Sequence, residues 1–328
     1  MHAIVFHRPG GPEVLEYVEV PDPRPAAGEV LIRVHAAGVN RADVLQREGR
    51  YPMPTGANPV PGLEVAGEIA ALGEGVTGWN VGDRFTTLTN GGGYAEYVCA
   101  PAVQLLRWPH GYDAVLAAAL PEACFTVWAN LFQAAALKAG ETCFIHGGRG
   151  GVGAMAIQLA AAFGAQVLAS SGTTEGCHDC AKLGASIVVN YHTEDFVAAC
   201  HRATNGRGVD VILDPIGAAN LQRNLAALAT DGRLSIIGFT GGAVADKVDL
   251  TPILARRLVI TGSAMRPRSA LEKGAIAVAL ADRVWPLLDR GACRPPLAKV
   301  FPLERAADAH RLMQTGGYLG KIVLAAAH

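Results

Sequence analysis

The stretch His146-Gly147-Gly148-Arg149-Gly150-Gly151-Val152-Gly153 decides the fold of this chain. An apolar run at residues 142–145 precedes it, and an alanine-rich segment at 154–163 follows it. Three glycines, Gly148, Gly150 and Gly153, have the spacing G-x-G-x-x-G. Glycines at this spacing permit a tight turn, close approach of a pyrophosphate, and close packing of a helix on a strand. The stretch therefore predicts a strand, a glycine loop and a helix whose first amides face the phosphates of a dinucleotide.

Short β-branched runs alternate with helical segments from about residue 138 to residue 262. This alternation is typical of a parallel sheet covered by crossover helices. We expect six strands, at residues 142–145, 166–169, 186–189, 209–213, 233–237 and 258–261, with helices that include 153–163 and 218–229. The pattern predicts an α/β fold with a doubly wound, mostly parallel sheet.

The first 120 residues have a different pattern. Short alternating segments such as 29–36 and 94–99 are separated by Gly and Pro clusters, which predicts a β-rich domain. The chain after residue 262 offers a helix at 303–314 and a last strand at 321–324, too little for a separate core. We therefore expect a β-rich domain at 1–121, a dinucleotide-binding domain at 122–262, and a tail at 263–328 that returns to the first domain.

Composition excludes several classes of protein. The 328 residues carry a formal net charge of −1, so no basic field favours nucleic acid or an anionic membrane. The start of the chain lacks the pattern of a signal peptide, and we find no apolar run near the roughly 20 residues that span a bilayer. Seven scattered cysteines fit buried thiols in a reducing, cytoplasmic setting. Cys177 and Cys180 form a lone C-x-x-C without a second pair, which predicts two thiols at a helix start rather than a metal site.

The residues after the second predicted strand bear on the choice of nicotinamide cofactor. Sites that prefer NAD place an Asp or Glu there, about 20 residues after the glycines. Here the stretch reads Ala169-Ser170-Ser171-Gly172-Thr173, which has hydroxyl groups and no carboxylate. We therefore expect NADPH, with NADH as the alternative. The cation that would hold a 2′-phosphate is left open between His178 and Arg149, and Tyr191 could lie against the adenine or the phosphate.

Several motifs along nearly the whole chain carry a family resemblance. They are Gly38-Val39-Asn40-Arg41-Ala42-Asp43, Gly49-Arg50-Tyr51-Pro52, Pro61-Gly62-Leu63-Glu64-Val65-Ala66-Gly67, Val81-Gly82-Asp83-Arg84, Gly91-Gly92-Gly93-Tyr94-Ala95-Glu96-Tyr97, the glycine loop, Gly238-Phe239-Thr240-Gly241-Gly242 and Gly320-Lys321-Ile322-Val323-Leu324. With these blocks the chain resembles the zinc-free quinone oxidoreductases of the medium-chain dehydrogenase/reductase superfamily, in particular the p53-inducible branch.

The resemblance implies a GroES-like β-rich catalytic domain, a Rossmann domain, NADPH, and a homodimer. Asn40 and Leu63 stand where zinc-dependent members carry a Cys and a His, and residues 81–97 contain no cysteine. Tetrahedral zinc needs three or four convergent Cys, His or carboxylate ligands, so we expect no zinc. One departure concerns Gly176, where many relatives resemble one another in carrying a Lys for the 2′-phosphate.

Without a metal to polarise an unactivated ketone, a quinone or an enone is the favoured hydride acceptor. A donor near the developing oxyanion would assist the transfer, and our candidates are Tyr51 and Asn40. Glu64 is either part of this site or structural, and Arg266 is either a contact of the site or part of a surface salt bridge. The cofactor-binding residues that we expect are Thr126, Gly148, Gly150, Gly151, Val152, Gly153, Ser171, Gly172, Thr173, His178, Tyr191, Phe239, Thr240, Gly241 and Lys321.

Two other functions stay open from the sequence. The chain could be an NADPH-binding structural or regulatory protein with little turnover, which would bind the cofactor without oxidising it. A zinc alcohol dehydrogenase would instead hold metal at near stoichiometry.

Overall fold

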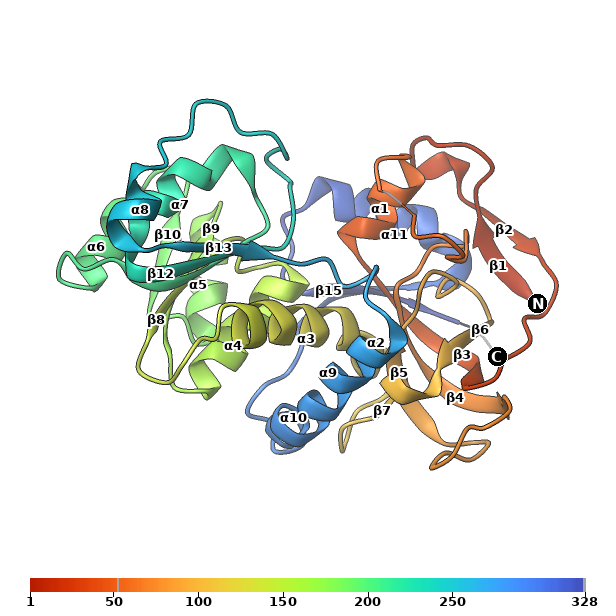
Figure 1. The fold of residues 1–328 in the computed structure, drawn as a ribbon. Helices are drawn as coiled ribbons and strands as arrows, with labels where there is room; N and C mark the ends of the chain where they lie inside the picture. Colours follow the sequence, from red (N-terminus) through yellow and green to blue (C-terminus); the bar gives the residue numbers. More distant parts are fainter. Residues whose placement is uncertain (52, 327–328) are drawn as a thin grey trace. The chain divides into compact units, whose positions relative to one another are not determined.

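The computed structural model describes residues 1–51 and 53–326 and divides the chain into two compact units (Figure 1). The first unit comprises Met1–Phe125, Arg266–Asp289 and Pro295–His328. The second comprises Thr126–Met265 and Arg290–Arg294. The segment after residue 265 therefore belongs mostly to the first unit.

The second unit is built on a six-stranded parallel sheet. Its strands, in spatial order, are β10 (Ile187–Asn190), β9 (Gln166–Ser171), β8 (Thr142–Ile145), β11 (Val209–Asp214), β12 (Leu228–Ile236) and β13 (Val259–Gly262). The chain moves outward in one direction from β8 and in the other from β11, so the strand order reverses between these two. The doubly wound parallel sheet predicted from the sequence is thus confirmed, and ligands of such sheets bind at the carboxyl ends of the strands near this reversal.

The helices that cover this sheet are α4 (Gly151–Ala162), α5 (Thr174–Lys182), α6 (Phe196–Ala203), α7 (Leu221–Ala227) and α8 (Thr251–Arg256). A seven-residue π-helix, Trp128–Ala134, precedes β8. The core takes one large side chain from each of five strands: Phe144, Leu168, Val189, Ile212 and Leu234, all fully buried.

The helix predicted at 218–229 is shorter in the structure. A 3-10 turn, Ala218–Asn220, leads into α7, and β12 already begins at Leu228. Leu228 and Ala229 are buried, and Leu228 pairs with Val209 of β11, so strand pairing overrides the helical pattern at this end.

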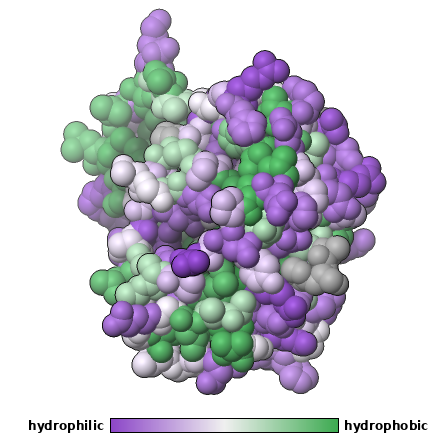
Figure 2. Space-filling model, turned by 90° about the vertical axis from the view of Figure 1, so that its right-hand side faces the viewer, coloured by the Kyte–Doolittle hydropathy of each residue, from purple (hydrophilic) through white to green (hydrophobic). Residues whose placement is uncertain are grey.

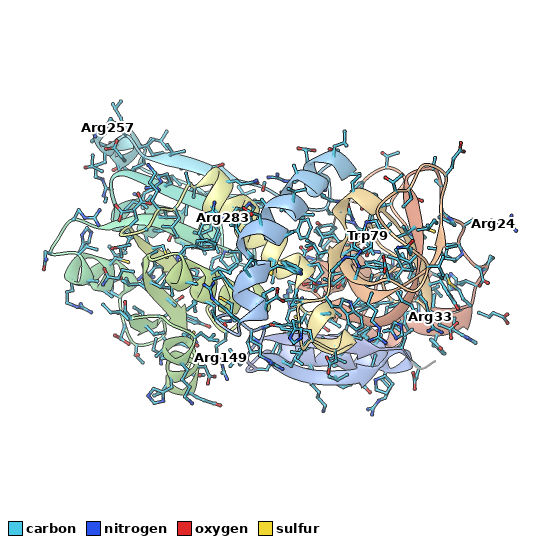
Figure 3. The ribbon with its side chains drawn as sticks, turned by 90° about the horizontal axis from the view of Figure 1, so that it is seen from below. Arg24, Arg33, Trp79, Arg149, Arg257 and Arg283 are labelled. Carbon is cyan, nitrogen blue, oxygen red and sulfur yellow. The ribbon has the colours of Figure 1, made fainter. Side chains whose placement is uncertain are left out.

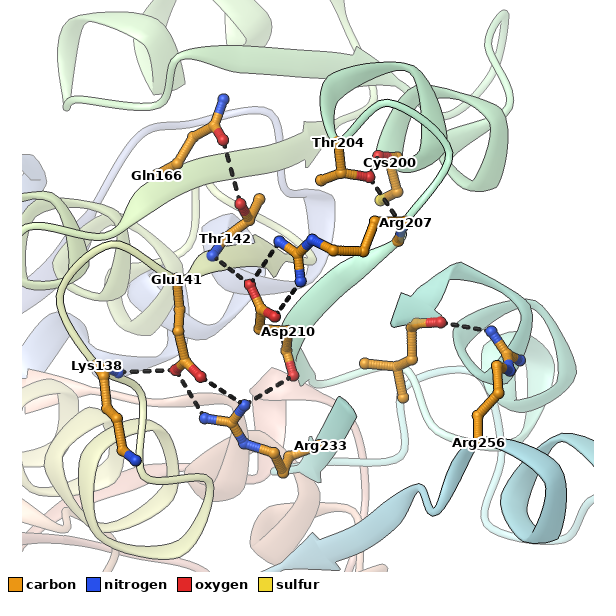
Figure 4. Close-up of polar contacts among 12 residues, drawn as sticks. Lys138, Glu141, Thr142, Gln166, Cys200, Thr204, Arg207, Asp210, Arg233 and Arg256 are labelled. Atoms are coloured by element: carbon orange, nitrogen blue, oxygen red, sulfur yellow. Dashed lines mark hydrogen bonds and ion pairs between the residues drawn. The ribbon is translucent and has the colours of Figure 1, made fainter. Parts of the chain in front are cut away.

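Charged side chains gather at the amino ends of the strands (Figure 4). Glu141 accepts hydrogen bonds from the Arg233 guanidinium at 2.7 and 2.9 Å and from the backbone N–H of Lys138 at 2.9 Å. Asp210 accepts from the backbone N–H of Thr142 at 2.8 Å and pairs with Arg207. These carboxylates connect β8, β11 and β12 at the amino ends of the strands. The glycine loop lies at the opposite, carboxyl ends.

The first unit contains a second, larger sheet. The strands are ordered β14 (Leu297–Pro302), β15 (Lys321–Ala325), β3 (Glu29–Val39), β4 (Glu64–Leu72), β5 (Arg84–Leu88) and β7 (Leu106–Arg107), with β6 (Tyr97–Pro101) paired to β3. A separate hairpin joins β1 (His2–Val5) to β2 (Glu16–Glu19). Because β15 pairs antiparallel with residues 36–39 of β3, residues 321–325 form an integral strand of this sheet.

The helices of the first unit are α1 (Arg41–Arg47), α2 (Ala114–Ala118), α9 (Ala270–Arg283), α10 (Trp285–Asp289) and α11 (Ala306–Thr315); α3 (Pro121–Val127) begins in it. Figure 2 shows hydrophilic and hydrophobic side chains interleaved on the face seen from the side of β1 and β2.

The expectation that no apolar run approaches the length of a membrane span is wrong. The near-continuous helical stretch Ala114–Ala134 has 21 residues and a mean hydropathy of 1.5, so by length and composition it could cross a membrane. In the structure 83% of its most apolar window is buried, as in the core helix of a folded domain.

Candidate functional site

The three motif glycines have different steric roles in the loop between β8 and α4. A Cβ on Gly148 would lie 2.6 Å from Cys180 Sγ, and a Cβ on Gly153 would overlap the carbonyl oxygen of Gly147. Around Gly150 the nearest atom to a Cβ is 3.5 Å away, so no packing demand of the protein explains this glycine. Gly150 is exposed at the start of α4, where free amides and open space suit a phosphate group.

The end of β9 contains the residues predicted to select the cofactor. Ser171 is buried at the last position of the strand, and Thr173 caps α5 by accepting from the backbone N–H of Gly176 at 3.0 Å. A Cβ on Gly172 would overlap the hydroxyl oxygen of Tyr191, so the half-exposed Tyr191 ring lies close to this turn. The structure thus brings Ser171, Gly172, Thr173 and Tyr191 together.

Arg149, labelled in Figure 3, reaches the same place from the glycine loop. A Cβ on Gly176 would overlap both Arg149 Cδ and Ser171 Oγ, which shows that the Arg149 side chain lies across Gly176. Its guanidinium pairs with Asp179 at 2.9 Å and with Glu175 at 3.7 Å, while the buried Nε has no hydrogen-bond partner in the described chain. Of the two cations considered from the sequence, His178 is exposed on α5, and Arg149 is the one beside Ser171.

The predicted nicotinamide-side residues of the second unit lie after β12. Thr240 bonds the Pro215 carbonyl through both its backbone N–H, at 3.1 Å, and its hydroxyl, at 3.0 Å. Gly241 donates to the carbonyl of Ile216 at 2.8 Å, and Phe239 is 59% exposed. This loop is therefore fastened to the loop after β11, at the carboxyl edge of the sheet. Thr126 is buried, and its carbonyl accepts from the Asn130 amide at 3.0 Å.

Asn40 and Lys321 lie together in the first unit. Asn40 caps α1 in a reciprocal box with Asp43, and its Nδ2 donates to Glu64 Oε1 at 2.8 Å. Lys321 Nζ donates to Asn40 Oδ1 at 2.6 Å and forms an ion pair with the Glu64 carboxylate. Both polar ends of the Asn40 side chain and the Lys321 ammonium thus have partners inside the protein, and their cofactor and substrate contacts stay predictions.

Tyr51 packs against Arg266, which the sequence left open between a contact of the site and a surface salt bridge. The Arg266 guanidinium lies 5.5 Å from the centre of the Tyr51 ring and donates to Gln46 Oε1 at 2.7 Å and Asn90 Oδ1 at 3.2 Å. Arg266 is 5% exposed, and its Nη2 has no hydrogen-bond partner in residues 1–51 and 53–326. Burial raises the pKa of Tyr51 above its ordinary value. Arg266 is therefore no surface salt bridge but part of a buried polar site.

Glu122 is a functional candidate that the sequence did not reveal. It stands in the first turn of α3 after Pro121, where an acidic residue is explained by helix geometry alone. Its backbone N–H donates to Glu64 Oε2 at 2.8 Å. Burial, and then the negative charge of Glu64, raise the pKa of the Glu122 carboxyl to about 7.

The sequence also did not reveal a row of buried, hydrogen-bonded polar side chains. Asp43 accepts from the Tyr94 hydroxyl at 3.2 Å, Tyr94 lies 3.2 Å from His310 Nε2, and His310 Nδ1 lies 3.3 Å from Arg47 Nη1. Burial raises the pKa of Asp43 to about 6, whereas burial and the Arg47 charge lower the pKa of His310 to about 3.

The donors near Asn40 do not fit zinc. Among the described residues, no group of three or more His, Cys, Asp or Glu side chains is placed to hold a metal ion. Leu63 is buried, and the Lys321 ammonium already binds Asn40 and Glu64, where it would repel a divalent cation. Cys177 and Cys180 are free thiols, and burial raises the pKa of Cys180 to about 12.

Comparison with known proteins finds two family models along the chain. Residues 26–110 match the alcohol dehydrogenase GroES-like domain, and residues 151–281 match the zinc-binding dehydrogenase model. The quinone oxidoreductase of Sus scrofa is 36% identical over 99% of this chain and 97% of its own length. The 2-haloacrylate reductase of a Burkholderia species is 35% identical over 98% of both chains. The crystal structure of Escherichia coli quinone oxidoreductase complexed with NADPH superposes with a TM-score of 0.88, at 29% identity, over 99% of this chain and 100% of that one.

Proposed function

Because this chain belongs to the quinone oxidoreductase family of the medium-chain dehydrogenase/reductase superfamily, we propose that it transfers hydride from NADPH to a quinone or another conjugated carbonyl compound. The observation that carries the choice of NADPH is the position of Arg149 across Gly176, beside Ser171. An arginine near the end of the second strand is the residue that accommodates a 2′-phosphate in this type of domain.

The glycine at position 176 therefore does not leave the proposed 2′-phosphate site without a cation. The space that a side chain at position 176 would need is occupied by Arg149 Cδ and Ser171 Oγ. The planar guanidinium can hold a phosphate with two hydrogen bonds, and the hydroxyl groups of Ser171 and Thr173 can donate as well. In this proposal Arg149, which reaches the same turn from the glycine loop, serves as the cation for the 2′-phosphate.

The nature of the acceptor follows from the donors in the first unit. A ketone without conjugation needs a Lewis acid, and the place next to Asn40 holds an ammonium group rather than metal ligands. A quinone or an enone is already electrophilic and needs alignment and a donor for the developing negative charge. Bound NADPH would supply the hydride. The chain would hold its phosphates at the glycine loop and offer Tyr51 and Arg266 to the acceptor.

Steady-state assays test this function. The purified chain is mixed with NADPH or NADH and a panel of 1,4-quinones, short enones and 2-haloacrylates, and cofactor oxidation is followed by absorbance. We expect turnover that is faster with NADPH at equal subsaturating concentrations. NADPH binding with no oxidation across the panel would instead support the structural or regulatory role, and metal at near stoichiometry would support a zinc dehydrogenase.

We also propose that two copies of the chain associate through β13. This strand is the last of the six-stranded sheet, and its Val259 and Ile260 side chains are 50% and 41% exposed. An unpaired apolar edge is a template for the same strand of a second copy, as twofold symmetry requires. Light scattering should give a dimer for the wild type and a monomer for Ile260→Lys. If the variant has the same mass as the wild-type dimer, the two copies associate through another surface.

A further inference from the structure

A hydrogen bond holds the backbone of Glu122, whereas its carboxyl group has no hydrogen-bond partner among the described residues. Its N–H is bonded to Glu64, which is fully buried and paired with Lys321. In the part of the chain that the structure describes, no hydrogen bond or ion pair is recorded for the Glu122 carboxyl group itself, and the residue is only partly buried. A mostly buried acid with an anchored backbone, and with no carboxyl partner among the described residues, can face a small molecule.

Charged groups from several elements act on this carboxyl electrostatically. Glu64 of β4 and Asp43 of α1 act on it with negative charge, and Lys321 of β15 and Lys273 of α9 act on it with positive charge. The charge of Glu122 in turn affects the pKa values of Tyr51 and Arg266, whose ring and guanidinium lie 5.5 Å apart, and we assign all three residues to one site. Lys273 has its ammonium bonded to the carbonyl of Arg266 at 3.2 Å, which ties α9 to this site.

Arg266 Nη2, which has no hydrogen-bond partner among residues 1–51 and 53–326, is the second feature of the site. A buried donor without an acceptor is costly, and such groups in folded proteins usually serve a ligand or a water molecule. Together with the Tyr51 hydroxyl, the guanidinium provides donors for an oxygen that gains negative charge.

We propose that Glu122 is the acid that donates the proton completing reduction of the acceptor, while Tyr51 and Arg266 hold the acceptor oxygen. This inference rests on the proposed function. Hydride adds to the β carbon of an enone, or to the quinone ring system, and the displaced π electrons move to the oxygen. The O–H bond of Glu122 then breaks, and the proton forms an O–H or C–H bond on the reduced product. Glu122 regains a proton from water, so acceptor, NADPH and one proton give reduced acceptor and NADP⁺.

Two properties favour Glu122 over Tyr51 as the acid. The Glu122 pKa of about 7 is close to the working pH, where a general acid is most effective. The pKa of the buried Tyr51 phenol is raised, so it holds its proton more tightly and is suited to donate a hydrogen bond.

The test compares wild type with Glu122→Gln, Glu122→Asp and a matched control, Glu304→Gln, which changes an exposed glutamate of the same unit. The wild-type kcat should fall as the pH rises through about 7, because the acid loses its proton. In Glu122→Gln we expect kcat to drop about 100-fold at pH 6 and to lose this dependence. Glu122→Asp should recover part of the rate with the dependence restored, and Glu304→Gln should match wild type.

A measurement without turnover accompanies the kinetics. The infrared band of a protonated carboxyl group should disappear from wild type as the pH rises through about 7, and Glu122→Gln should lack this change. If wild type turns over and Glu122→Gln keeps both its rate and its pH profile, the inference is wrong while the proposed function stands. If no acceptor is reduced by wild type at any pH, the proposed function itself fails.

Discussion

The Lys321 ammonium forms an ion pair with the Glu64 carboxylate in the interior of the first unit, where the two side chains are 5% and 0% exposed. The pair joins β15, at the end of the chain, to the start of β4. Asn40 bonds to both partners, and a Cβ on Gly38 would overlap the Glu64 carboxylate, so the pair is tightly enclosed.

Lys321→Met should destabilise the protein by about 3–5 kcal/mol, because it leaves a buried carboxylate without its cation. The double variant Lys321→Met with Glu64→Gln should recover part of the loss, since the remaining group is neutral. Urea unfolding of the wild type, the single variants and the double variant measures both effects. A loss below about 1 kcal/mol in Lys321→Met would mean that the pair behaves like an exposed one.

Arg149→Met should weaken NADPH binding by about 10–100-fold and leave NADH binding nearly unchanged, because only NADPH carries the 2′-phosphate. Asp179→Asn removes the carboxylate 2.9 Å from the guanidinium, so it should tighten NADPH binding. Fluorescence titration of both cofactors against wild type and the two variants gives the dissociation constants.

The outcome for Arg149→Met that contradicts this assignment is an equal loss for NADPH and NADH, which would place its effect on the loop backbone. Arg149→Lys serves as the charge-preserving control. It should retain an intermediate NADPH preference, because a lysine offers a point charge rather than a planar fork.

Local sequence patterns predicted the sheet of the second unit and the glycine loop, because strand alternation and glycine spacing are properties of neighbouring residues. Position 176 shows that such local patterns do not predict contacts between different segments of the chain. A glycine in the sequence does not indicate which side chain packs against it, and here the Arg149 side chain reaches Gly176 from another segment. His310 lies 263 residues from Arg47 and 216 from Tyr94, so only the folded chain reveals their contact.

Glu122→Gln should stabilise the protein at pH 8 and leave its stability nearly unchanged at pH 4. The Glu122 pKa is raised from 4.5 to about 7 in the folded chain, so folding binds its proton more tightly. The resulting stability is present below the unfolded pKa and is lost as the pH rises through the folded pKa. Since one pKa unit corresponds to about 1.4 kcal/mol, we expect a gain of about 1–3 kcal/mol at pH 8 from urea unfolding.

For this prediction, Glu304→Gln should follow wild type at both pH values. Equal stability of Glu122→Gln and wild type at pH 8 would show that the folded and unfolded chains bind the Glu122 proton alike. The carboxyl would then be ionised throughout the neutral range, and a proton donor with a pKa near 7 would have to be sought elsewhere.

His310 should make the protein sensitive to acid. Arg47 has no acceptor atom, so its Nη1 donates to His310 Nδ1, and the ring is neutral with its proton on Nε2. That proton points to the Tyr94 oxygen, and Tyr94 donates to Asp43. Burial of the ring lowers the His310 pKa to about 3, and the Arg47 guanidinium adds to this because a second proton would have to sit on Nδ1, facing it.

The sign of the effect follows from this lowered pKa. As the pH falls from 6.5 towards 3, the unfolded chain takes up a proton at His310 and the folded chain does not, so stability is lost across this window. Asp43 and Glu122 act in the opposite direction, because their pKa values are raised. His310→Gln can still accept from Arg47 and donate to Tyr94 but cannot titrate. Its free energy of unfolding, measured in urea, should therefore fall less than that of wild type between pH 6 and pH 4, by about 1–2 kcal/mol over that interval. Parallel curves for the two proteins would show that His310 is protonated alike in the folded and unfolded chains.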